Sequence, residues 1–436
     1  MDYKEALEYL LRFADYERLP RSGIVWDLRR MERLLEGLGN PQHAARTVHV
    51  AGTKGKGSTA AMIASVLVQA GRRTGLYTSP HLLSFTERIQ VDGKPIAGAD
   101  WARLTESLVP HVEAVNQEGA FGELTTFEIL TALAFACFRE VGAEFQVVEV
   151  GLGGRLDATN VVRPQVCVMT SISYDHMDVL GDTLTKIAGE KAGIIKPGAA
   201  VVAAPQFPEA MAVIERVCRE RGVPLVRVGE DVTWRAGAFS PEGQSFRVKG
   251  LKGEYDLRIP LLGEHQLENA AAAVAAVEAL DAGIPAAAIT AGLAKVNWPG
   301  RLHVLRREPW VVVDAAHNGY SMKRLGEALQ RHFKYDHLTL ILGFGGDKDV
   351  AGMVREACAL TNDIILAPSR HPRALQPAAL SAEFLKRGVT PRLAPSVAEA
   401  LKLALAKAKP PDLICAAGSV FVVAEVMEEM GGEKYH

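Results

Sequence analysis

The chain has 436 residues, of which 48% are hydrophobic and 23% are charged, and its formal net charge is −2. This length predicts two or three domains with sizeable cores, and the small net charge argues against a nucleic acid or an anionic membrane as partner. No run of about 18 apolar residues predicts a membrane span. The cysteines are scattered without a metal-binding or redox spacing, so we expect reduced thiols and a cytoplasmic protein.

Predicted strands and helices alternate through the first two thirds of the chain. Residues 1–17 predict an amphipathic helix, because acids stand where a secretory signal would carry a basic start. Strands are expected at 47–50, 74–77, 146–150, 165–169, 200–203 and 224–228, and helices at 58–70, 127–141, 185–194, 208–221 and 266–282. The strands lack polar alternation, which favours a parallel sheet covered by helices on both faces. Three short strands within residues 231–260 predict a small antiparallel annex.

The alternation restarts after residues 296–300, which we interpret as a hinge. Strands are expected at 310–313, 338–342, 364–367 and 413–416, and helices at 321–332, 350–360, 378–387 and 396–407. We therefore predict an α/β fold. Residues 1–296 would form a P-loop-containing, mostly parallel sheet domain with the annex, and residues 297–436 a smaller, Rossmann-like α/β domain.

The first segment with chemical character is VHVAGTKGKGST, residues 48–59. Its spacing departs from the usual P-loop, because two residues separate Gly52 from Gly55-Lys56 and Gly57 precedes Ser58. A strand leads in and a helix leads out, so backbone N–H groups could receive an anion. Lys56 could reach terminal phosphates and Ser58 could bind magnesium, but a plain Gly-rich turn with solvated lysines stays open as an alternative.

Three further side chains stand out by their positions. Glu149 ends a strand before GLGGRLDATN, where its carboxylate needs a cation, either magnesium or Arg155. His176 follows the next strand and is a candidate ligand of a second divalent ion, although a lone histidine is more often a polar or core residue. Lys191 lies in an apolar helix, so we expect it to be paired with a carboxylate or chemically altered.

A series of segments carries a family resemblance. In chain order they are AGTKGKGS, TSPHL, LTTFE, EVGLGGRLDATN, SYDHMDVLG, IAGEKAGIIKPG, GEHQLENA, WPGR and DAAHN. Together they resemble the folylpolyglutamate synthase and dihydrofolate synthase family of the Mur ligase superfamily, from about residue 20 to about residue 425. The resemblance implies an ATP-dependent ligase that phosphorylates a pteroate or folate carboxylate and lets the amine of glutamate displace the phosphate.

The resemblance also implies roles for individual residues. The implied ATP contacts are Gly52, Thr53, Lys54, Gly55, Lys56, Gly57, Ser58, Asn269, Arg301 and Asp314. The implied ligands of two magnesium ions are Ser58, Ser79, Glu149, His176 and a carbamylated Lys191. The implied pterin or folate contacts are Thr125, Phe127, Leu156, Asp157 and Ala158, and the implied glutamate contacts are His317 and Ser419. The expected catalytic residues are Lys56, Lys191, Asp314 and His317.

The implied ligands are small molecules. They are ATP, Mg²⁺, dihydropteroate, folates, glutamate and an unspecified monovalent cation, held by a monomer whose two domains close around them. Two residues depart from the family pattern, because Lys54 stands where Asn is usual and Ala315 where Gly is usual. Phe127 could instead be ordinary helix core, and Arg301 could merely cap the domain linker.

Two other functions are weighed against this interpretation. One is a Mur-type ligase acting on a peptidoglycan precursor, against which the TSPHL and LTTFE segments argue. The other is a non-catalytic nucleotide-binding relative, against which Glu149, His176, Lys191 and Asp314 argue. The sequence does not decide between the two folate activities.

Overall fold

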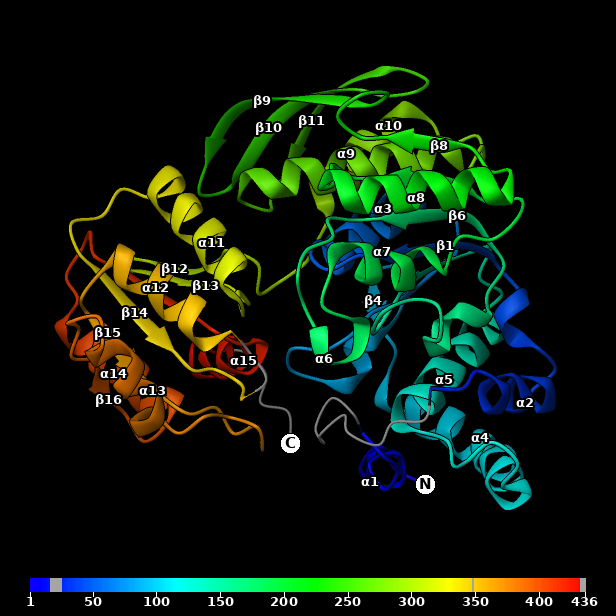
Figure 1. Ribbon diagram of the computed structural model, residues 1–436, viewed down its shortest axis with the longest axis horizontal. Helices are drawn as coiled ribbons and strands as arrows, with labels where there is room; N and C mark the ends of the chain where they lie inside the picture. Colours follow the sequence, from blue (N-terminus) through cyan, green and yellow to red (C-terminus); the bar gives the residue numbers. More distant parts are fainter. Residues whose placement is uncertain (16–25, 347–348, 432–436) are drawn as a thin grey trace. The chain divides into compact units, whose positions relative to one another are not determined.

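The structure is a computed structural model that describes residues 1–15, 26–346 and 349–431. This part of the chain divides into two compact units. The first contains residues 1–237, 245–259 and 265–296, and the second contains residues 238–244, 260–264 and those from 297 onward. Each unit is built on a mostly parallel sheet with helices (Figure 1), so the predicted α/β class is confirmed.

An eight-stranded sheet forms the centre of the first unit, in the order β4-β3-β2-β5-β1-β6-β7-β8. Its pairs are parallel from β2 to β8, whereas β2–β3 and β3–β4 are antiparallel. The strands are β1 Arg46–Ala51, β2 Thr74–Tyr77, β3 Ile89–Val91, β4 Lys94–Pro95, β5 Phe145–Glu149, β6 Pro164–Met169, β7 Ala200–Ala203 and β8 Leu225–Arg227. All five residues of β5 are buried, as expected for a central strand covered on both faces.

Helices cover both faces of this sheet. They are α1 Tyr3–Leu10, α2 Arg29–Gly37, α3 Lys56–Gln69, α4 Gly98–Glu118, α5 Thr126–Glu140, α6 Met177–Leu180, α7 Leu184–Ala192, α8 Pro208–Arg221, α9 Glu264–Ala279 and α10 Ala286–Lys295. One core joins α1, α2, α4 and α5 to Tyr77 and Val148, and a second packs α7 and α8 on β6 and β7. On the other face α10 lies against α3, where a Cβ on Gly292 would stand 2.4 Å from the Val66 Cα.

A separate three-stranded sheet has the order β11-β10-β9. Its strands are β9 Thr233–Ser240, β10 Gly243–Lys249 and β11 Glu254–Ile259. Only two residues connect β9 to β10, which requires an antiparallel hairpin. Burial alternates along β11, so one face is packed and the other faces solvent. This sheet is the predicted annex.

The second unit contains a six-stranded sheet in the order β12-β13-β17-β14-β15-β16, parallel except for β12 against β13. Its strands are β12 His303–Arg307, β13 Trp310–Val313, β14 Leu338–Leu342, β15 Ile364–Leu366, β16 Arg392–Leu393 and β17 Leu413–Ala417. Its helices are α11 Gly319–His332, α12 Val350–Leu360, α13 Pro377–Leu385, α14 Val397–Lys407 and α15 Val420–Glu429. The central β13, β17 and β14 end side by side, which is where open α/β sheets carry their ligands.

Some elements differ from the prediction. Helix α3 begins at Lys56 rather than at residue 58, because Gly55 adopts a left-handed conformation and caps the helix directly. The N-terminal helix ends at Leu10, and residues 16 and 17 of the predicted helix lie outside the described part of the chain. Helix α4 was not predicted, and it carries Pro110 in its interior, a residue that ordinarily ends a helical pattern. Among the described helices, none combines the length and the apolar character that crossing a membrane requires.

Candidate active site

The loop from Gly52 to Gly55 connects β1 to α3. Both glycines have positive φ angles, 152° and 88°. A Cβ on Gly52 would lie 1.9 Å from the Thr170 Oγ1, and a Cβ on Gly55 would lie 2.3 Å from the Asn269 Oδ1. Glycine is therefore required at both positions, for conformation and for space. The helix that follows turns the N–H groups of its first turn toward this loop, which is the arrangement that favours an anion.

The same loop is fastened to the segment after β6. The N–H groups of Thr53 and Lys54 donate to the Ser171 carbonyl over 2.8 and 3.1 Å, and the Thr53 hydroxyl bonds the Ser173 backbone over 3.1 Å. The Lys54 ammonium donates to Asp175 over 3.0 Å. Thr53 and Lys54 were expected to cradle phosphates, but their backbone donors are used inside the protein. The first turn of α3 is thus the better-placed anion site.

Lys191 is buried beside this loop, where its ammonium donates to a backbone carbonyl rather than to a carboxylate. It lies on α7 with 5% of its surface exposed, and its Nζ donates to the Gly52 carbonyl over 2.8 Å. Burial, followed by the nearby Lys56 ammonium, lowers the pKa of Lys191 to about 7, against the opposing effect of Asp175. An amine with this pKa is partly uncharged at neutral pH, which is the form that reacts with carbon dioxide.

Glu149 lies at the end of β5 and is 4% exposed. Its Oε2 accepts the backbone N–H of Ser79 over 3.2 Å, so the structure brings two predicted magnesium ligands together. The alternative pairing of Glu149 with Arg155 is wrong, because the Arg155 guanidinium bonds Glu190 over 2.9 Å. A buried carboxylate at a strand end and beside a phosphate loop is suited to a divalent cation.

The remaining predicted metal ligands lie on the same loops. Ser58 is buried in the first turn of α3, and its Oγ accepts the Gln266 amide over 3.4 Å. His176 follows β6 with φ 50°, and its backbone N–H donates to the Asp175 carboxylate over 3.1 Å. Within the described ranges, no cluster of three or more His, Cys, Asp or Glu side chains could hold a metal alone. Magnesium fits this donor set, because it binds beside nucleotide phosphates through one or two carboxylates and keeps waters.

Asn269 supports the loop from α9. Its amide donates to Gln266 over 3.0 Å, and its Oδ1 occupies the space that a Gly55 side chain would need. Side chains of α9 thus pack directly on the phosphate loop, which fits the predicted nucleotide contact at Asn269.

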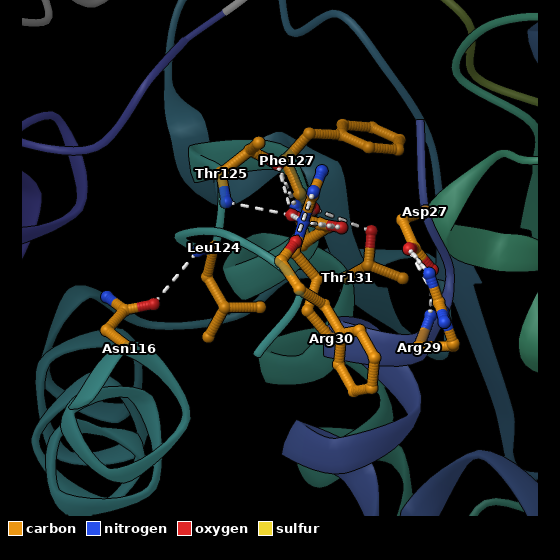
Figure 2. A network of polar contacts seen from close by, with 10 residues as sticks. Asp27, Arg29, Arg30, Asn116, Leu124, Thr125, Phe127 and Thr131 are labelled. Carbon is orange, nitrogen blue, oxygen red and sulfur yellow. Dashed lines mark hydrogen bonds and ion pairs between the residues drawn. The ribbon is translucent and has the colours of Figure 1, made fainter. Parts of the chain in front are cut away.

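Thr125 belongs to a buried polar network (Figure 2). The Glu128 N–H donates to the Thr125 hydroxyl over 3.2 Å, and the Thr125 N–H donates to the Glu128 carboxylate over 2.8 Å, which together form the capping box of α5. The Thr125 hydroxyl also donates to the Glu128 carboxylate over 2.8 Å. Arg30 of α2 donates from its Nε to both Glu128 oxygens over 2.8 and 2.9 Å. The donor of the Thr125 hydroxyl is therefore engaged internally, and we reinterpret Thr125 as a residue that positions the start of α5.

Phe127 lies beside this network and is only partly buried. Its ring packs over Gly151, where a Cβ would come within 2.5 Å of the ring, and its centroid is 6.1 Å from that of Tyr77. The ring is an edge of the core around α5 rather than its centre. This partial exposure is compatible with the predicted contact to a flat pterin.

Asp157 is buried in the loop after β5, between Leu156 and Ala158. Its oxygens accept the N–H groups of Leu152 and Thr159 over 2.8 and 3.0 Å, and burial is the main cause that raises its pKa. The Asp157 carboxylate therefore shapes the loop from inside. Leu156, which is partly exposed, is the better candidate for a substrate contact in this run.

Sequence reasoning missed the fully buried His49 of β1. Its Nε2 lies 2.9 Å from the Thr159 Oγ1, and that hydroxyl donates to Asp157. The hydroxyl proton is committed to the carboxylate, so the His49 Nε2 must carry a proton and donate. Burial lowers the pKa of His49 to about 3, which keeps the ring neutral. Nothing in the local pattern of β1 could have identified this partner, because it lies 110 positions away in the chain.

The second unit contains the remaining predicted site residues, which are Arg301, Asp314, His317 and Ser419. Asp314 follows β13 and accepts the N–H groups of Leu302 and Ala316 over 2.7 and 2.8 Å, and burial is the main cause that raises its pKa. His317 places its Nδ1 2.8 Å from the Ala315 carbonyl. Ser419 caps α15 by accepting the Val422 N–H over 3.2 Å.

The structure bears on two open points of the sequence, which are the alanine at position 315 where glycine is usual and the alternative role of Arg301 as a cap of the domain linker. Ala315 is not among the described residues with positive φ, so the methyl group is accommodated without backbone strain. Its N–H donates to the Gly300 carbonyl over 3.1 Å, and the Arg301 guanidinium donates to the same carbonyl over 3.1 Å. Arg301 therefore does hold the start of this unit, which leaves its predicted contact to ATP a prediction.

The Arg30–Glu128 pair should be important for stability. Arg30→Met should lower the free energy of unfolding by about 3–5 kcal/mol, because it leaves a buried carboxylate without its charged partner. Urea denaturation measures this loss, and adding Glu128→Gln should recover part of it. The exposed Arg103–Glu140 pair is the control, and Arg103→Met should cost at most about 1 kcal/mol. Equal losses in Arg30→Met and Arg103→Met would contradict the expectation.

Two family models and several relatives match this chain. The Mur ligase middle domain matches residues 50–277, and the Mur ligase glutamate ligase domain matches residues 300–420. The dihydrofolate synthase/folylpolyglutamate synthase of Bacillus subtilis is 40% identical over 358 residues, which are 81% of this chain and 83% of that protein. The folylpolyglutamate synthase of Lacticaseibacillus casei is 37% identical over 440 residues and covers 100% of both. This chain belongs to the folylpolyglutamate synthase and dihydrofolate synthase family.

Solved structures of folylpolyglutamate synthases share the fold. The Mycobacterium tuberculosis folylpolyglutamate synthase complexed with ADP matches with a TM-score of 0.93 at 34% identity, over 99% of each chain. An FPGS–AMPPCP–folate complex matches with a TM-score of 0.85 at 34% identity, over 99% of this chain and 100% of that one. The predicted family, the fold and the ligase class are thereby confirmed.

Proposed function

We propose that this chain is an ATP-dependent ligase that joins glutamate to the carboxylate of dihydropteroate and of reduced folates. Both reactions would use one active site and pass through an acyl phosphate. The observation that carries the proposal is the buried Lys191, whose Nζ donates over 2.8 Å to the Gly52 carbonyl of the phosphate loop. A buried amine at that place, able to be carbamylated, has a chemical use in a phosphoryl-transfer site and little use in a plain turn. The relatives' names and the nucleotide and folate complexes support the same function.

The residues of the first unit would bind and orient the nucleotide. The first turn of α3 with Lys56 would hold the phosphates, and Asn269 would meet the adenine. Glu149, Ser58 and Ser79 would hold one Mg²⁺, whereas His176 and a carbamylated Lys191 would hold a second. Magnesium supplies neutralisation of the charge that moves between oxygens during phosphoryl transfer.

The other substrates would be bound by the remaining predicted residues. Phe127 and Leu156 would contact the pterin or folate, while Thr125, Asp157 and Ala158 shape the surface around them. In the second unit, Arg301 and Asp314 would contact ATP, and His317 and Ser419 would contact the incoming glutamate. We further propose domains over residues 1–296 and 297–436, a monovalent cation as an additional cofactor, and a cytoplasmic monomer.

Incubation of the purified protein with Mg²⁺, ATP and labelled glutamate tests this function. Dihydropteroate and tetrahydrofolate are offered in turn, and both should yield labelled product and free phosphate. Nucleotide binding without turnover on either acceptor would instead support a non-catalytic relative. Product from only one acceptor would remove the proposed bifunctionality.

The conformation of Gly55 leads to a prediction about nucleotide binding. Gly55→Ala should weaken the binding of AMPPCP about tenfold or more, because the new Cβ would meet the Asn269 Oδ1 at 2.3 Å and the backbone has φ 88°. Isothermal calorimetry measures the effect. Gly71→Ala is the matched control, because Gly71 follows α3 with φ 74° and a Cβ there meets nothing within 4 Å. Equal weakening by both substitutions would exclude a role of the loop geometry.

A further inference from the structure

The ammonium group of Lys54 is paired with a carboxylate of its own chain, so Lys54 is not simply an additional cation for the phosphates. Its Nζ donates to the Asp175 Oδ2 over 3.0 Å, and both side chains are shielded, with exposed fractions of 19% and 13%. The other oxygen of Asp175 accepts the N–H of His176 over 3.1 Å and lies 3.7 Å from the His176 Nε2. One carboxylate thus connects the phosphate loop to the histidine predicted to bind magnesium.

The backbones of the two loops are already joined at their other end. Both Thr53 and Lys54 donate to the Ser171 carbonyl, and the Thr53 hydroxyl exchanges hydrogen bonds with Ser173. The Lys54–Asp175 ion pair adds a side-chain contact between the same two loops, next to His176. His176 needs such support, because a side chain other than glycine at φ 50° carries a conformational cost.

We propose that Lys54 is a positioning residue, whose ion pair with Asp175 holds the His176 loop against the phosphate loop and thereby sets the magnesium dependence of nucleotide binding. The proposal rests on the proposed function, since it takes His176 as a magnesium ligand. It also explains the departure from the family pattern. An Asn at this position could donate a neutral hydrogen bond but could not form a charged pair, and its shorter side chain reaches less far.

The alternative is that Lys54 swings away from Asp175 and binds a phosphate directly. The two mechanisms predict different effects of Asp175→Asn on nucleotide binding. If Lys54 acts through Asp175, then Lys54→Met and Asp175→Asn should have the same effect, and the double variant should add nothing. If Lys54 binds phosphate, Asp175→Asn would release the lysine and leave nucleotide binding equal or stronger, whereas Lys54→Met would weaken it.

Calorimetric titration of AMPPCP over a range of Mg²⁺ concentrations separates these cases. We expect each single variant to raise the Mg²⁺ concentration for half-maximal binding about fivefold, the double variant to match the singles, and Lys54→Arg to stay within about twofold of the unmodified protein. Weaker binding in Lys54→Met at saturating Mg²⁺, with unchanged or tighter binding in Asp175→Asn, would overturn the proposal. Additive effects in the double variant would overturn it as well.

A second measurement uses the protein without nucleotide or metal. Thermal unfolding of the unmodified protein, the two single variants and the double variant should show that Lys54→Met and Asp175→Asn lower the Tm non-additively. Lys186→Met is the control, because Lys186 forms an exposed pair with Asp182 at 2.9 Å and should leave both the Tm and the Mg²⁺ dependence nearly unchanged. Additive Tm losses would contradict the ion pair. Neither measurement needs turnover, so a protein without ligase activity would refute the proposed function and still allow this test.

Discussion

Lys191→Ala should lower the turnover of the ligase at least about a hundredfold, while the folded structure is retained. The lysine is buried against the Gly52 carbonyl, and its pKa of about 7 makes the uncharged amine available at neutral pH. Carbamylation would convert this cation into an anion that can bind magnesium, and the alanine variant loses that anion. Single-turnover measurements with dihydropteroate, ATP and glutamate report the chemical step.

The proposed carbamate also predicts that the activity of Lys191→Ala can be partly restored by added anions. Short carboxylic acids, which can occupy the vacated space and supply an anion, should restore part of the activity of Lys191→Ala. Lys186→Ala is the control on the same helix, because Lys186 is exposed and pairs with Asp182. It should keep full activity and should not respond to added acids. Full activity of Lys191→Ala without rescue would refute the carbamate.

The second large effect is expected at Glu149. Glu149→Gln should raise the Mg²⁺ concentration needed for half-maximal activity about tenfold or more, because an amide oxygen is a weaker ligand than a carboxylate. The shape and the hydrogen bond from Ser79 are preserved by this substitution, so a loss would report charge rather than folding. Steady-state rates over a range of Mg²⁺ concentrations give the value. Glu144→Gln, at the exposed residue directly before the same strand, should leave the metal dependence unchanged.

The sequence predicted most of the sheets correctly, for a physical reason. Central parallel strands are buried on both faces, so they appear as short apolar runs that need no knowledge of their neighbours. The strands at 74–77, 200–203, 310–313 and 338–342 agree with the structure residue for residue. Two-residue edge strands such as β4 and β16 carry no such signal, because their pairing depends on a partner strand.

The candidate site divides in a similar way. The positions of Glu149 at a strand end and of Lys191 inside an apolar helix follow from local pattern, and the structure agrees with both. The engagement of the Thr125 hydroxyl and of the Asp157 carboxylate inside the protein could not be predicted, because it depends on which donors the folded chain brings near. A polar residue in a motif can contact a substrate or shape the surface around it, and only its hydrogen-bond partners distinguish the two.

By itself, the sequence determined the α/β class, the order of the family motifs and the phosphate loop with its required glycines. Only the tertiary structure decided which cation meets which anion. Lys54 and Asp175 are 121 positions apart, and Arg30 and Glu128 are 98 positions apart. Local periodicity reports the burial of a side chain along its own element, whereas the partner of a charge is set by the packing of distant segments. The role of Lys54, unexplained in the sequence, follows from that packing.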